Sequence, residues 1–259
     1  MGIWTVFQES IFDLLHWIEL YTGDWGLAII VLTILLRAVL WPLTDKQTKS
    51  AHETRKHTPK IKEIQTKYKD DPEKKQQELM AYYSEHKVNP LAGCLPMLLQ
   101  MPIFIALYQV LGGTPDKPGL MMQFLTDTGA TGSFFSLVPN LTRAPSWIWS
   151  NEGPVAAIPY ILLVALFGLS IWLPQQLMAA DKQQKMIGTY MGVFMLIIGW
   201  TVPAGVLLYW DTSAMLGVAQ QQYTQRKLAK ADEAAELAAA AEKVKNKSKK
   251  KGKNKSIEA

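Results

Sequence analysis

Long apolar blocks that alternate with strongly charged blocks constrain this chain more than any other feature. Apolar residues make up 49% of the sequence, and they gather in stretches long enough to cross the hydrocarbon core, which takes about 20 residues per helix. A soluble domain would instead mix apolar and polar residues at the period of a helix or a strand. The pattern therefore predicts an all-α membrane protein.

Five apolar segments qualify as transmembrane helices, and some of them are short enough to require a bundle around them. The last two come from one continuous apolar block that is too long for a single span. Val202-Pro203-Ala204-Gly205 lies in the middle of this block, and proline next to glycine is typical of a turn. The expected spans are residues 25–43, 91–111, 155–173, 187–202 and 204–220.

The basic residues predict the orientation of these spans. Of the 27 Lys and Arg residues, 11 lie between residues 44 and 90, another 11 follow Gln220, and none precedes Arg37. Because cytoplasmic loops of membrane proteins are enriched in Lys and Arg, both basic segments are expected in the cytoplasm. Five spans then place the N-terminus outside and the C-terminus inside. Segment 112–154, with only Lys117 and Arg143, is expected outside.

Three segments are expected outside the spans. Residues 1–24 are acidic, unlike a secretory signal, and carry apolar residues on one helical face, which predicts an extracytoplasmic amphipathic helix. Segment 44–90 is expected to be a helical hairpin whose second arm begins at Asp71-Pro72, because aspartate favours the N-cap and proline the first helical position. The basic tail, 229–259, is expected to be helical to about residue 243 and then disordered.

Arg37 is the residue that most strongly suggests a functional site. A charge inside a span is costly, so it usually faces a polar interior. Gln100 and Asp211 are expected at a similar depth on other spans, and Thr33 lies one turn from Arg37. These side chains together predict a hydrophilic groove. The alternative is that Arg37 extends to lipid phosphates at the membrane surface.

The other candidate site residues also have interpretations that involve no function. Asp211 is either a counter-charge for Arg37 or an acid at the membrane interface, and Tyr209 and Trp210 are more often packing residues than a site. The sequence shows no nucleophile–base pair, metal cluster or nucleotide-binding loop, so we expect no enzyme, no catalytic residue, no metal and no cofactor. The single cysteine, Cys94, excludes an internal disulfide.

Several motifs resemble one known family. Residues 89–96, with the sequence NPLAGCLP, and residues 100–104, with QMPIF, are similar to the second core span of the YidC family of membrane-protein insertases. Residues 36–44 resemble the first core span with its groove arginine. Residues 203–210, followed by Gln220-Gln221-Gln222, resemble the last, and residues 159–162 fit the third more loosely.

The resemblance implies a five-span core, here residues 25–228, with a groove that opens to the cytoplasm and a mobile cytoplasmic hairpin. It implies that Arg37 receives polar or acidic parts of client proteins and that Thr33 and Trp210 contact client segments. Asp211 departs from the family, which usually has an apolar residue there. The implied location is the bacterial cell membrane.

The resemblance also implies what the chain does and with whom. It would be an insertase that accepts membrane-protein clients in the groove and releases their apolar segments into lipid. The ribosome and the Sec translocon are further candidate partners. The Lys-rich tail fits either the anionic lipids of the membrane or the RNA phosphates of the ribosome. Two other classes stay open: a small-solute transporter or channel, and an assembly factor that only binds partners.

Overall fold

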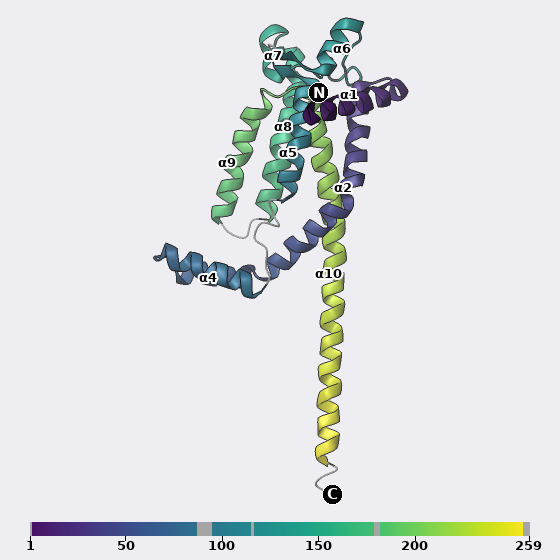
Figure 1. Cartoon of the computed structure of the whole chain (residues 1–259). Helices are drawn as coiled ribbons and strands as arrows, with labels where there is room; N and C mark the ends of the chain where they lie inside the picture. Colours follow the sequence, from purple (N-terminus) through teal and green to yellow (C-terminus); the bar gives the residue numbers. More distant parts are fainter. Residues whose placement is uncertain (1, 87–94, 115–116, 179–181, 256–259) are drawn as a thin grey trace. The chain divides into compact units, whose positions relative to one another are not determined.

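The computed structural model is a predominantly helical fold and describes residues 2–86, 95–114, 117–178 and 182–255 (Figure 1). Its elements follow one another along the chain as ten helices and one two-stranded hairpin within these ranges. They are α1 (Ile3–Thr22), α2 (Trp25–Lys56), α3 (Thr58–Lys67), α4 (Pro72–Glu85), α5 (Leu95–Leu111), β1 (Gly113–Thr114), β2 (Lys117–Pro118), α6 (Leu120–Thr128), α7 (Pro145–Asn151), α8 (Pro154–Met178), α9 (Lys182–Gly199) and α10 (Ala204–Lys255).

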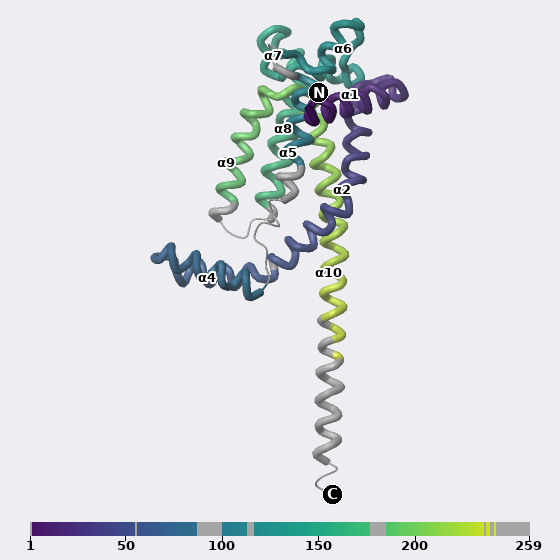
Figure 2. Tube along the Cα trace, viewed as in Figure 1, coloured from purple at the N-terminus to yellow at the C-terminus, as the bar shows by residue number. Residues whose placement is uncertain are grey.

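The chain divides into two compact units. The first contains Met1–Trp41 and Pro96–Val218, and the second contains Pro42–Leu95 and Ala219–Ala259. Helices α2 and α10, whose course along the chain can be followed in Figure 2, contribute one part to each unit.

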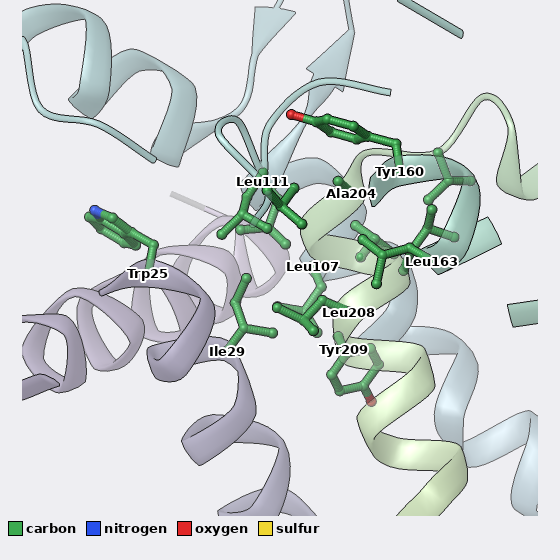
Figure 3. Packing of buried hydrophobic residues seen from close by; sticks show 14 of the residues in the cluster. Trp25, Ile29, Leu107, Leu111, Tyr160, Leu163, Ala204, Leu208 and Tyr209 are labelled. Atoms are coloured by element: carbon green, nitrogen blue, oxygen red, sulfur yellow. The ribbon is translucent and has the colours of Figure 1, made fainter. Parts of the chain in front are cut away.

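The first unit holds the hydrophobic core. Its buried residues come from α1, α2, α5, α6, α7, α8 and α10 and from the segments before α7 and α10, and the side chains of Leu107, Leu111, Tyr160, Leu163 and Leu208 gather in one cluster (Figure 3). Helices α8 and α9 make the most extensive helix–helix contact of this unit. The core therefore joins segments that lie far apart in the sequence, as expected where apolar helices pack into a bundle.

Helix α1 is amphipathic, as predicted. Leu15 and Ile18 are buried against the core, whereas Trp17 and Leu20 are more than half exposed. The helix ends at Gly23, whose φ of 67° is in the left-handed region that favours glycine at a helix C-terminus. The exposed apolar face is what a helix lying in a membrane interface needs.

Segment 112–153 carries more structure than a plain loop. It contains the β1–β2 hairpin, α6 and α7, none of which the sequence patterns predicted. Its backbone carbonyls at Leu141 and Arg143 accept hydrogen bonds from the first amides of α10, Gly205 and Ala204, at 2.8 and 3.0 Å. The start of a helix has unpaired N–H groups, and this segment satisfies two of them.

The predicted break between the last two spans is confirmed. Helix α9 ends at Gly199 and α10 begins at Ala204, with Pro203 immediately before it. One predicted feature is wrong: α10 continues to Lys255 where a disordered tail was expected after about residue 243. Helix α2 continues past Leu43, the predicted end of the first span, to Lys56. A helix need not end where its apolar stretch ends, because Lys and Arg are also good helix formers.

The second unit contains the predicted helical hairpin, which is formed by α3 and α4 and follows the end of α2 at Lys56. The carboxylate of Asp71 accepts a hydrogen bond from the Lys74 amide at 3.0 Å, which confirms the predicted N-cap, and Pro72 is the first residue of α4. In the same unit α2 and α10 are joined by polar contacts: Thr224 Oγ1 donates to Asp45 at 2.9 Å, and His52 Nε2 lies 2.8 Å from Asp232.

Within the described residues, two helices are long and apolar enough to cross a membrane by length and composition, over Trp25–Thr54 and Pro154–Gln176. Two shorter apolar helices cover Gln100–Leu111 and Lys185–Gly199. The first residues of the predicted second span, 91–94, lie outside the described ranges. The structure thus confirms a helical protein, which is a coarser result than five spans.

Candidate functional site

Arg37 lies on the part of α2 that belongs to the first unit, among apolar neighbours. Its side chain is half-buried, and Nε donates a hydrogen bond to Ser213 Oγ of α10 at 2.9 Å. Ser213 is almost fully buried, with 3% of its surface exposed. The guanidinium is therefore held against α10 by a buried hydroxyl group and does not extend as an isolated charge.

A second polar contact joins α10 to α5. Gln100 Nε2 donates to the hydroxyl oxygen of Tyr209, a side chain that is buried in the core. Tyr209 and Ser213 lie one turn apart on the same face of α10. Arg37, Ser213, Tyr209 and Gln100 thus form two hydrogen-bonded pairs along one face of α10, which contact α2 and α5, and we call these four residues the polar chain.

The polar chain brings together three of the predicted site residues, Arg37, Gln100 and Tyr209. Ser213 was missed, although the sequence held a signal for it. Residues four apart lie on the same helical face, so Ser213 must lie on the face of Tyr209.

Trp210 and Thr33 lie outside the polar chain. Trp210 packs edge-on against Phe104 and Phe167, with ring centroids 5.7 and 5.4 Å apart. Thr33 is fully buried, and its hydroxyl donates to the carbonyl of Ile29 on its own helix at 2.6 Å. The observed role of both side chains is local packing and hydrogen bonding.

Asp211 has no observed partner. Only 7% of the residue is exposed, and both carboxyl oxygens are buried without a hydrogen bond. No ion pair joins Asp211 to Arg37 in the described part of the chain. The helical period explains this, because a residue two positions from both Tyr209 and Ser213 points to the opposite side of α10, about 200° away at 100° per residue.

The chemistry available to this arrangement is hydrogen bonding and charge. In the described ranges, no group of three or more His, Cys, Asp or Glu side chains could hold a metal ion. The polar chain offers a cation, an amide and two hydroxyl groups surrounded by apolar helices. A polar or acidic segment of another molecule would find hydrogen-bond partners there.

Comparison with known proteins identifies the family of the chain. Residues 17–232 match the family model described as "60Kd inner membrane protein". The chain belongs to this family, the YidC family of membrane protein insertases. Its members are insertases rather than enzymes, and the chain is accordingly a protein of the cell membrane.

Individual relatives show how much of the YidC architecture the chain represents. It is 36% identical over 244 residues to the membrane protein insertase YidC of Wolinella succinogenes, covering 93% of this chain and 40% of that protein. It is 36% identical over 238 residues to the YidC of Syntrophobacter fumaroxidans, covering 87% of this chain and 39% of that protein. The chain thus spans about two fifths of the length of these relatives.

A solved structure gives the same fold. The crystal structure of an active YidC insertase with its first transmembrane domain resolved superposes with a TM-score of 0.63 at 26% sequence identity, over 85% of this chain and 46% of that chain. The fold of this protein is therefore YidC-like.

Proposed function

We propose that this chain inserts client proteins into the bilayer through a hydrophilic groove built around the polar chain. The single observation that carries the proposal is the pair of hydrogen bonds, Arg37 to Ser213 and Gln100 to Tyr209, along one face of α10 inside an apolar bundle. A buried polar network of this kind is expensive to build unless it serves a polar ligand. Thr33, Trp210 and Asp211 remain proposed groove residues from the sequence, although Asp211 lies on the side of α10 opposite to Tyr209 and Ser213.

The proposed mechanism is physical and involves no covalent step. A wet groove shortens the apolar distance that a client's hydrophilic tail must cross. The client's apolar segment then moves into lipid, where its burial is favourable. The membrane potential adds a force on client charges.

The proposal includes five spans with the N-terminus outside, the hairpin α3–α4 in the cytoplasm and the groove open to the cytoplasm. Helices α2, α5, α8, α9 and the first part of α10 supply the spans. A cysteine introduced at Lys60 should then be shielded from an impermeant external thiol reagent, whereas one at Leu125 should react. Labelling at residue 60 in intact cells would contradict this topology.

Reconstitution tests the function itself. Purified protein in liposomes should insert a small single-span or double-span client and should not move small solutes. Movement of solutes without insertion would support the alternative of a transporter or channel. Client binding without insertion would support an assembly factor.

Arg37→Ala tests the role of the polar chain. We expect this variant to lose insertion of clients with acidic translocated tails more than insertion of clients with neutral tails. Arg37→Lys should retain much of the activity, because lysine keeps the positive charge even without the planar guanidinium. Full activity of Arg37→Ala toward acidic-tailed clients, at normal protein level, would refute the groove role of Arg37.

A further inference from the structure

The segment between α6 and α7 exposes two large apolar side chains close together. Phe135 has 54% of its surface exposed, and Leu137 has 63%. Ser136, between them, is exposed as well. No charged residue occurs between Asp127 and Arg143. We call Phe135 and Leu137 the apolar tip.

The backbone at the apolar tip is unfavourable for phenylalanine. The amide of Leu137 donates to the carbonyl of Phe134 at 3.1 Å, which closes a four-residue turn with Phe135 as its first central residue. The φ of Phe135 is 46°, in the left-handed region. Turns with a positive φ at this position are dominated by Gly, Asn and Asp, and a bulky residue there is strained. The backbone therefore does not explain phenylalanine at this position, and neither does the core, because the side chain is exposed.

A buried carboxylate holds the turn against the start of α2. Asp24 is only 8% exposed. One of its oxygens accepts from the amide of Phe135 at 2.5 Å, and the other accepts from an amide in the first turn of α2 at 2.8 Å. The amide of Gly26 donates to the carbonyl of Ser133 at 3.2 Å, and a Cβ added to Gly26 would overlap the ring of Phe134. The strained turn is thus fixed to the beginning of a helix.

The start of α2 also gives the depth of the apolar tip. The candidate span of α2 begins at Trp25, between Asp24 and Gly26, the two residues that hold the turn. The same junction follows α1, whose exposed apolar face includes Trp17 and Leu20 and suits a membrane interface. Helices α1, α6 and α7 lie at one end of the first unit (Figure 1). The apolar tip therefore lies near the level where acyl chains meet the headgroups.

We propose that the apolar tip is a membrane anchor, which places Phe135 and Leu137 among the acyl chains of the leaflet next to the start of α2. This inference goes beyond the proposed insertase function and rests on the span of α2 alone. Moving two large apolar side chains out of water is favourable and offsets the strain at Phe135. Asp24 is the positioning residue that sets where the anchor lies.

Two features favour lipid over a protein partner as the occupant. The segment carries no charge from residue 128 to residue 142, so its entry into acyl chains leaves no charge in an apolar medium. Two side chains are also far smaller than the area of about 1,000 Å² that a specific protein interface buries.

Spin-label depth measurements test the proposal. The single cysteine is removed by Cys94→Ser, and a nitroxide is attached through Phe135→Cys or Leu137→Cys in protein reconstituted into liposomes of phosphatidylcholine and phosphatidylglycerol. Collisions with oxygen, which concentrates among acyl chains, are compared with collisions with a water-soluble nickel chelate. We expect both labels at about 5–10 Å below the headgroups, the depth of an interfacial apolar segment.

Two other positions calibrate the measurement. Asp127→Cys, at an exposed charged position of α6, should report water. Leu35→Cys should report the acyl chains, because Leu35 is 47% exposed and lies two residues from Arg37, on the opposite side of α2. Water at Leu35→Cys would refute the proposed span of α2 and the anchor with it.

A change at Phe135 separates anchoring from folding. Asparagine tolerates the left-handed region, so Phe135→Asn should leave the melting temperature in detergent unchanged or raise it. With the label at Leu137→Cys, Phe135→Asn should shift the label toward water. Phe135→Trp, which keeps a large apolar ring, should leave the label at its depth. A shift accompanied by a lower melting temperature would mean that Phe135 has a structural role and no anchoring role.

The remaining outcomes separate the anchor from the proposed function. If the labels at the apolar tip report water while Leu35→Cys reports lipid, the anchor is overturned and the proposed function stands. If the same labels report water in liposomes but are protected in native membranes, a protein covers the tip, which also overturns the anchor. Equal depth of the Leu137→Cys label with Phe135, Phe135→Asn and Phe135→Trp would remove Phe135 from the anchor.

Discussion

Asp211 allows a prediction about stability that runs against the usual effect of a core substitution. Both of its carboxyl oxygens are buried without a partner, and only 7% of the residue is exposed. We expect Asp211→Ala to stabilise the protein by about 2 kcal/mol, because an unpartnered buried polar group costs about 1–3 kcal/mol and alanine is the better helix former. Such a gain corresponds to a rise in melting temperature of about 4–8 °C.

The assay is thermal unfolding of the purified protein in detergent. Asp211→Asn is the matched control, since it keeps the size of the side chain and a polar group and should therefore change the melting temperature little. A marked loss of stability in both variants would refute the reasoning, because it would mean that the carboxyl group has a stabilising partner.

The same variant tests whether Asp211 acts as the counter-charge of Arg37. Because no ion pair joins the two residues, the effects of Arg37→Ala and Asp211→Ala on stability should add to within about 0.5 kcal/mol. If the double variant instead recovers what Arg37→Ala loses, the two charges are coupled and the hypothesis of a pair is restored.

Three further outcomes are expected. Tyr160→Phe should destabilise by about 1–3 kcal/mol in thermal unfolding, because the backbone N–H of Asn140, 2.9 Å from the tyrosine oxygen, loses its acceptor. Deleting 244–259 should weaken co-sedimentation with ribosomes at low salt and leave the melting temperature unchanged; unchanged co-sedimentation would favour lipid as the partner. Hydrogen bonds from His52 and then Lys56 hold the pKa of Asp232 below its usual range. The contact of Asp232 with α2 should therefore be complete above the usual aspartate pKa and weaken as the pH falls through the lowered pKa. Hydrogen exchange of α2 near His52 should increase over that pH range, and Asp232→Asn should remove this pH dependence.

Local sequence signals predicted several features of this fold correctly. The start of α4 at Asp71-Pro72 and the break before Ala204 both follow from residues with strong backbone preferences. Helix ends were predicted less well, because the end of an apolar stretch marks the membrane boundary and not the end of the helix. Helix α2 therefore continues to Lys56.

The candidate site was also predicted only in part, because sequence position alone does not give the direction of a side chain. Depth along the spans grouped Arg37 with Gln100, Thr33 and Asp211, but depth does not report the direction of a side chain around its helix. Asp211 was grouped by depth, and it points away from the face of Tyr209. Ser213 was overlooked because small side chains are common in membrane helices, and only the position of Arg37 in space shows its hydrogen bond.

The attachment of the first turn of α10 to segment 112–153 has an electrical consequence in the proposed mechanism. The carbonyls of Leu141 and Arg143 accept hydrogen bonds from the amides of Gly205 and Ala204, so these two amides need no water. With a groove wet to the level of Arg37, the transmembrane voltage would fall mainly across the part of the bundle that holds no water. A client charge entering the groove would thus meet most of its driving force, about 2.3 kcal/mol per 100 mV, over a fraction of the membrane thickness. The field would be concentrated on the short path that the client must still cross.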